Sequence, residues 1–93
     1  MSFKLDLHIH TESHGKTYIN AEQLQQSLVY NGIDGIAVTN FFDISHAIWL
    51  KRKLKDHIII VGQEIWTTEG HIVGLGLKER IADSQDVADT IGL

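Results

Sequence analysis

The sequence carries two histidines near its start that are separated by a single apolar residue. The segment Asp6–Thr11 reads Asp-Leu-His-Ile-His-Thr, with the histidines at positions 8 and 10. Alternation of apolar and polar residues predicts a strand here, in which side chains two residues apart project to the same face. At a rise of about 3.3 Å per residue, the Cα atoms of His8 and His10 lie roughly 6.6 Å apart, so both imidazoles can reach one metal ion. The alternative is a pair of polar residues on a solvent-facing strand.

A second group of polar residues follows a run of apolar ones. Glu64 comes shortly after Ile58–Val61, at the end of a strand expected to be buried. A buried carboxylate is costly unless it is paired. A metal ion would supply the partner, while a salt bridge to a lysine or exposure at the strand end are the alternatives. His71 follows the turn Thr67–Gly70 and begins a strand expected to pair with that of Glu64. It is either a metal ligand or a structural residue.

Apolar periodicity predicts the elements that must position these side chains. The first strand, residues 3–10, has an apolar face and a polar face, formed respectively by Leu5, Leu7 and Ile9 and by Asp6, His8 and His10. Asn20 followed by Gln23 predicts a capped helix to about Tyr30. The apolar run 35–39 is typical of a parallel strand covered on both faces. The other expected elements are a helix from Asp43 or Ser45 to about Lys55, strands at 57–65 and 71–77, and a short helix from Ser84 that turns Val87, Ala88 and Ile91 inward.

This order, β-α-β-α-β-β-α, predicts an α/β fold with a mostly parallel sheet and an antiparallel returning strand. A chain of 93 residues fits one domain, spanning residues 1–93.

Composition narrows the classes of partner and environment. The net charge of −4 and the pI near 5.8 argue against nucleic acid or an anionic membrane as a main partner. The basic residues that cluster in Lys51–Lys55 are interpreted as a solvated helix face. There is no cysteine, which excludes disulfides and thiolate metal sites. No apolar run approaches the ~20 residues of a membrane span and the start lacks a signal-peptide core, so a cytoplasmic protein is expected.

Three segments together resemble one family. Asp6–Thr11, Gly32–Thr39, and Gly62–Ile65 followed by Gly70–Ile72 resemble in order and interval the motifs of the polymerase and histidinol phosphatase (PHP) domain family, over about residues 4–77. The resemblance implies the first half of a distorted β/α barrel with a cluster of divalent metals (Zn²⁺, Mn²⁺ or Fe²⁺) that hydrolyses phosphate esters. It also implies that His8 and His10 bind one metal, that Glu64 bridges two, and that His71 binds the second.

The sequence also departs from the family pattern. Thr39-Asn40-Phe41 stands where the family has Thr-Asp-His, so the position tied to a further metal lacks its usual ligands. His14 lies near another family ligand, at an imperfect spacing, and His46 and His57 are interpreted as helix-surface and strand-start residues. PHP domains are much longer, and their last ligands lie in a C-terminal half with no counterpart here.

The sequence therefore predicts a partial PHP-like metal-dependent phosphoesterase domain with an incomplete, weakly held metal site. The alternative is a catalytically inactive PHP-derived interaction or structural module. A half-barrel leaves two sheet edges and an apolar face open, which predicts a homo-oligomer. A monomer whose segment 78–93 folds back over the open side is the other possibility.

Overall fold

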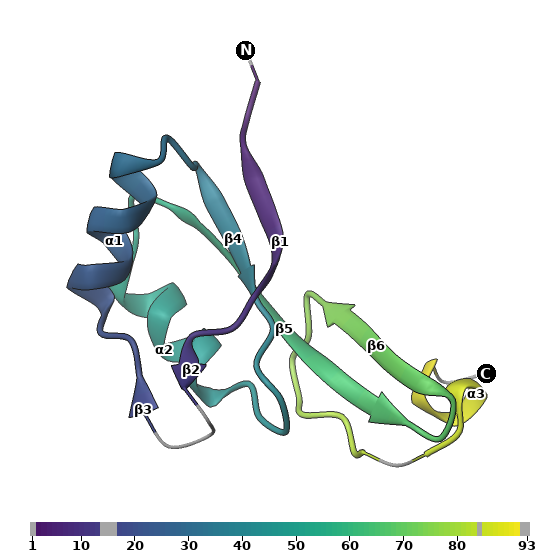
Figure 1. The fold of residues 1–93 in the computed structure, drawn as a ribbon. Coiled ribbons are helices and arrows are strands. Elements are labelled where there is room, and N and C mark those ends of the chain that lie inside the picture. Colours follow the sequence, from purple (N-terminus) through teal and green to yellow (C-terminus); the bar gives the residue numbers. More distant parts are fainter. Residues whose placement is uncertain (1, 14–16, 84, 92–93) are drawn as a thin grey trace.

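A four-stranded sheet forms the centre of the protein, seen in a computed structural model that describes residues 2–13, 17–83 and 85–91 (Figure 1). Its strand order is β1 (Leu5–Ile9), β4 (Gly35–Val38), β5 (Ile58–Thr67) and β6 (Gly70–Leu75). The pairs β1–β4 and β4–β5 are parallel, whereas β5–β6 is antiparallel. The expected α/β class and the antiparallel return of β6 are thus confirmed. The sheet as a whole is mixed rather than mostly parallel, because β5 runs on past β4 and turns straight back on itself.

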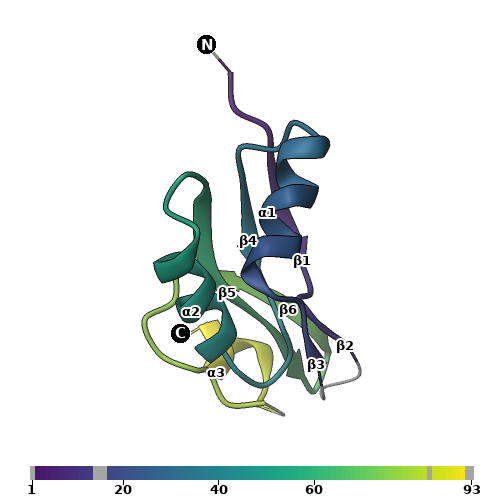
Figure 2. The same ribbon diagram turned by 90° about the vertical axis from the view of Figure 1, so that its left-hand side faces the viewer.

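Two helices cover the same face of this sheet, α1 (Ala21–Tyr30) and α2 (Ser45–Lys53) (Figure 2). The predicted cap of α1 is present: Asn20 Oδ1 accepts a hydrogen bond from the Gln23 backbone N–H at 2.8 Å. The N-cap position of α2, Ile44, has no side-chain cap. Asp43, the residue before it, accepts hydrogen bonds from the backbone N–H groups of Ile44 and Ser45. In the described part of the chain, no helix is long and apolar enough to cross a membrane.

The core lies between these helices and the sheet. Alternate residues of β5 point toward the helices, and apolar residues of α1 and α2 pack against them. The buried core side chains are Leu24, Leu28, Ile36, Val38, Ile44, Ala47, Leu50, Leu54, Ile59 and Val61. Full burial of a side chain of this size contributes about 1.5–3 kcal/mol.

Two small elements differ from the expected pattern. A two-stranded hairpin, β2 (Glu12–Ser13) with β3 (Thr17–Tyr18), follows β1 and adds two strands to the predicted order. Strands of two residues show no periodicity, so the sequence could not indicate them. The last helix is α3 (Val87–Ile91). Its Ile91 is 58% exposed, contrary to the expected inward position, because a five-residue helix is too short to bury a full stripe. Ser84 and the side chain of Ala88 lie outside the described part.

The C-terminal segment crosses the helix-side face of β5 rather than the open face. Gln63, which is fully buried, donates from its amide nitrogen to the Ile81 carbonyl and accepts from the Ile81 N–H, both at 2.9 Å. The face of the sheet opposite the helices keeps apolar side chains that are 36–44% exposed, namely Leu5, Ile58, Val73 and Leu75. We call this set the open face.

Candidate metal centre

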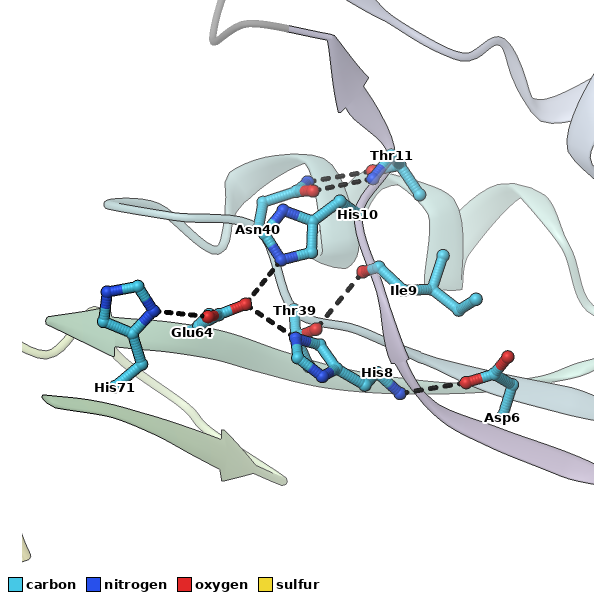
Figure 3. A network of polar contacts seen from close by, with 9 residues as sticks. All are labelled: Asp6, His8, Ile9, His10, Thr11, Thr39, Asn40, Glu64 and His71. Carbon is cyan, nitrogen blue, oxygen red and sulfur yellow. Dashed lines mark hydrogen bonds and ion pairs between the residues drawn. The ribbon is translucent and has the colours of Figure 1, made fainter.

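Four predicted residues meet beyond the carboxyl end of β4, on the open side of the sheet. The Nε2 atoms of His8 and His10 lie 2.6 and 2.7 Å from Glu64 Oε1. The Nδ1 atom of His71, on β6, lies 2.9 Å from Glu64 Oε2. Figure 3 shows the imidazoles approaching the carboxylate from opposite sides, with His71 on one side and the other two histidines on the other. The predicted proximity of Glu64 to both strand histidines is therefore confirmed, and His71 joins them.

A β-bulge in β1 aims His8 at this cluster. Asp6 pairs with Ile36 and Ile9 pairs with Val38, so three steps along β1 match two along β4. Asp6 and Ile9 consequently share the helix-side face, and the strict alternation expected from the sequence is wrong for this strand. The bulge frees the His8 N–H, which donates to Asp6 Oδ1 at 3.1 Å. Bulges of this kind re-aim side chains beside functional sites.

The two residues that follow β4, Thr39 and Asn40, connect the strands β1 and β5 beside the cluster. The Thr39 N–H donates to the Ile9 carbonyl at 2.7 Å, and the Glu64 N–H donates to the Asn40 carbonyl at 3.1 Å. The Asn40 side chain accepts from the Thr11 N–H at 2.7 Å and donates to Thr11 Oγ1 at 2.8 Å. Asn40 thus contacts Thr11 instead of offering its oxygen to the histidine cluster.

The electrostatics of the cluster centre on Glu64, which is only 8% exposed. Burial raises the pKa of its carboxyl, but hydrogen bonds from His8, His10 and His71 outweigh that effect and lower the pKa from 4.5 to about 2. The carboxylate is therefore ionised near neutral pH. In contrast, the imidazoles of His8 and His71 are about half exposed.

Aromatic rings line the side of the cluster where the family pattern would place a further histidine. Phe41 lies edge-on to His10 with ring centroids 4.6 Å apart, and it also contacts the rings of Trp66 and His71. Trp66 in turn stacks on His71 at 5.2 Å. Phe42 follows in a left-handed conformation with φ of 67°, which is unusual for a bulky residue. This wall is apolar and supplies no ligand atom.

The donor set fits a divalent transition metal. One atom from each of His8, His10 and Glu64 lies within 4.8 Å of the others. Nitrogen and carboxylate donors suit Zn²⁺, Mn²⁺ or Fe²⁺. Ligands bonded at about 2.0–2.1 Å in a tetrahedral site stand roughly 3.4 Å apart. The observed spacings of 2.6 and 2.7 Å therefore require the side chains to separate slightly, and the exposed His8 has room to do so.

Other sequence interpretations have different outcomes. His14 lies outside the described residues. His46 is not a helix-surface residue, because its ring is half-buried, its Nδ1 lies 2.7 Å from Thr11 Oγ1, and it stacks on Trp49. Thr11 and its two hydrogen bonds with the Asn40 side chain were not predicted from the sequence. The one available signal was that Asn40 replaces an acidic residue of the family pattern.

Comparison with known proteins gives one informative match. No family model matches the chain, and no solved structure matches it. An uncharacterized protein of Methanocaldococcus jannaschii is 33% identical over 100 aligned positions, covering 95% of this chain and 58% of the relative. The chain thus spans a little over half the length of the curated relative it matches.

Proposed function

We propose that the protein is a PHP-like, metal-dependent phosphoesterase domain with an incomplete metal site. The observation that carries this proposal is the convergence of His8, His10 and Glu64 donor atoms within 4.8 Å of one another. The resemblance of the three sequence motifs to the PHP family supplies the reaction class. The chain spans 58% of the length of its relative. The activity of a protein of that full length is therefore also a proposal.

In this proposal each residue has a distinct role. His8, His10 and Glu64 Oε1 hold one divalent ion, while Glu64 Oε2 and His71 offer donors for a second. Such ions supply charge stabilisation for a phosphoryl group and lower the pKa of water. The chain itself holds Glu64 ionised and keeps it from bulk water beside Phe41. The first ion has three protein donors and the second has two, so we expect the second to be held more weakly.

Metal binding and hydrolysis test this function separately. Zn²⁺ and Mn²⁺ are titrated into chelator-treated protein by calorimetry, and hydrolysis of p-nitrophenyl phosphate and bis-p-nitrophenyl phosphate is followed with each metal. We expect binding that is lost in Glu64→Gln and His10→Ala, with hydrolysis only in the metal-loaded wild type. His57→Ala, outside the cluster, serves as the control. Wild-type protein that binds neither metal would contradict the proposal.

A second candidate function is an inactive PHP-derived module that keeps the fold and serves interaction. It is favoured by Asn40 and Phe41, whose side chains contact Thr11 and neighbouring rings and leave the further metal position without donors. Metal binding without hydrolysis of either phosphate ester would favour this module.

We further propose that the protein is cytoplasmic and assembles with copies of itself. The partly exposed apolar side chains of the open face support the assembly, because such patches are uncommon on monomers.

A further inference from the structure

A chain of directed hydrogen bonds runs beside the histidine cluster through three buried or half-buried side chains. Asn40 Nδ2 donates to Thr11 Oγ1 at 2.8 Å, and Thr11 Oγ1 lies 2.7 Å from His46 Nδ1. Asn40 and Thr11 are 3% and 5% exposed, so water does not substitute freely for these contacts. These hydrogen bonds connect the segment after β4, the residue after His10, and α2.

The direction of this network follows from the Thr11 hydroxyl. Its oxygen accepts the Asn40 N–H, and His46 Nδ1 lies 2.7 Å away on its other side. Burial is the main effect that lowers the pKa of the His46 imidazole, which favours its neutral form. A neutral imidazole has one donor and one acceptor nitrogen. We therefore assign Nδ1 as the acceptor of the Thr11 hydroxyl proton, which leaves the ring proton of His46 on Nε2.

The Asn40 backbone makes a second connection. Its carbonyl accepts the Glu64 N–H at 3.1 Å, while its side-chain oxygen accepts the Thr11 N–H at 2.7 Å. A single residue therefore fixes the backbone at Glu64 and the backbone directly after His10. Figure 3 shows Asn40 bonded to Thr11 with its amide turned away from Glu64.

We propose that Asn40 is a positioning residue that sets the separation of His10 and Glu64 through Thr11 and His46. This inference rests on the proposed metal site but assigns Asn40 no bond to the metal. It also explains why an amide serves at this position. An aspartate cannot donate to Thr11 Oγ1; the hydroxyl would have to turn toward the carboxylate and leave His46 Nδ1 without its proton donor.

The sharpest test is Asn40→Asp, which restores the acidic residue of the family pattern. If position 40 acted as a ligand, this variant would bind metal more tightly. We expect instead that Asn40→Asp and Thr11→Val weaken Zn²⁺ binding by about 10–100-fold, the usual effect of losing a group that orients a ligand. Thr11→Ser keeps the hydroxyl and restores wild-type affinity. Asn20→Asp is the matched control, because that side chain serves α1 as an acceptor.

A measurement without metal separates this inference from the proposed function. Two-bond ¹H–¹⁵N correlation spectra of the chelator-treated protein identify the protonated ring nitrogen of His46, and we expect it to be Nε2. The His10 ring resonances shift in Thr11→Val and keep their wild-type positions in Thr11→Ser. A proton on His46 Nδ1, unchanged His10 resonances in Thr11→Val, or unweakened Zn²⁺ binding by Asn40→Asp would each overturn the inference. If Asn40→Asp does not fold, Thr11→Val decides.

If the wild type binds no Zn²⁺ yet the spectra behave as expected, the proposed function fails and the positioning role stands.

Discussion

Glu64 is the residue on which the candidate centre depends. Its two oxygens receive three imidazoles that come from two strands, β1 and β6. A side chain with a single oxygen could not contact the imidazoles on both sides, as the two carboxylate oxygens of Glu64 do. The carboxylate is buried, and the imidazoles around it are what make its ionised form stable there.

The first prediction concerns acid. The folded-state pKa of Glu64, about 2, lies below its usual value of 4.5. A depressed pKa means that the unfolded chain binds the proton more tightly, so stability rises with pH between these values. The contribution of Glu64 is thus complete above pH 4.5 and is lost as the pH falls toward about 2. Urea unfolding with chelator present measures it.

Glu64→Gln lacks this titration at every pH. We therefore expect the difference in unfolding free energy between wild type and Glu64→Gln to be constant near neutrality and to shrink in acid. A difference that stays unchanged down to pH 2 would show that the histidine contacts do not depress this pKa.

The residues of the histidine–Glu64 cluster were predictable, and the residues that hold them in place were not. His8, His10 and Glu64 were revealed by residue type and by their spacing relative to apolar runs, although Glu64 lies within β5, which continues to Thr67, and not at the strand end expected from the sequence. Thr11 and His46 act through contacts between segments 35 positions apart. A threonine after a strand and a histidine in a helix occur for many unrelated reasons, so the sequence alone could not predict that these two side chains are in contact.

Among the elements, the bulged strand β1 contributes most to the site. The second prediction is that Asp6→Ala weakens Zn²⁺ binding, because the His8 N–H loses its acceptor and the bulge can relax toward regular pairing. Asp6→Asn retains an acceptor oxygen and should keep most of the affinity. Calorimetric titration of each variant measures the effect.

Asp34→Ala is the matched control. Asp34 Oδ2 also accepts a backbone N–H of the β1 segment, that of Lys4 at 2.7 Å, but at the end remote from the histidines. Equal losses of affinity in Asp6→Ala and Asp34→Ala would mean that general loosening of β1, rather than the bulge, controls the site.

The third prediction concerns helix α2. Asp43 accepts hydrogen bonds from the backbone N–H of Ile44 and Ser45, and the Ser45 hydroxyl contact is the main cause of the lowered pKa of its carboxyl. We expect Asp43→Ala to lower the unfolding free energy by about 1 kcal/mol, as for other lost side-chain hydrogen bonds to the backbone. Asp43→Asn should lower the unfolding free energy by a smaller amount, because the amide oxygen can still accept a hydrogen bond. Denaturant unfolding measures both variants, and equal losses would contradict a stabilising role for these backbone hydrogen bonds.

Element prediction succeeded where a pattern was long. The capped helix α1 and the strands β4, β5 and β6 follow from periodicity and turn residues. The bulge in β1 was hidden because the letters alternate perfectly from Leu5 to Ile9, while the extra residue is visible only from its pairing with β4.

For the whole molecule, the prediction is self-association through the open face. Both helices lie on the other face, so Leu5, Ile58, Val73 and Leu75 stay partly exposed beside the histidine cluster. β1 and β6 are also the sheet's two edges. We expect sedimentation equilibrium at micromolar concentration to give a mass of at least twice the 10.5 kDa of one chain.

Ile58→Lys should shift this equilibrium toward the single chain, since it places a charge on the open face. Val29→Lys is the control: Val29 is 66% exposed on α1. A wild type that sediments as one folded chain near 10.5 kDa, or an equal effect of both lysine variants, would rule out the open face as the contact.

The Gln63 contact with Ile81 has a consequence for how this sequence can vary. Gln63 binds the main-chain N–H and carbonyl of residue 81, and these groups are the same for any amino acid except proline. For this contact, the number of residues between β6 and residue 81 therefore matters more than which residues they are. Over generations, positions 78 and 79 can exchange residues more freely than position 80, where Arg80 donates to the Phe42 carbonyl. Gain or loss of a single codon in this segment would instead move residue 81 out of register with Gln63.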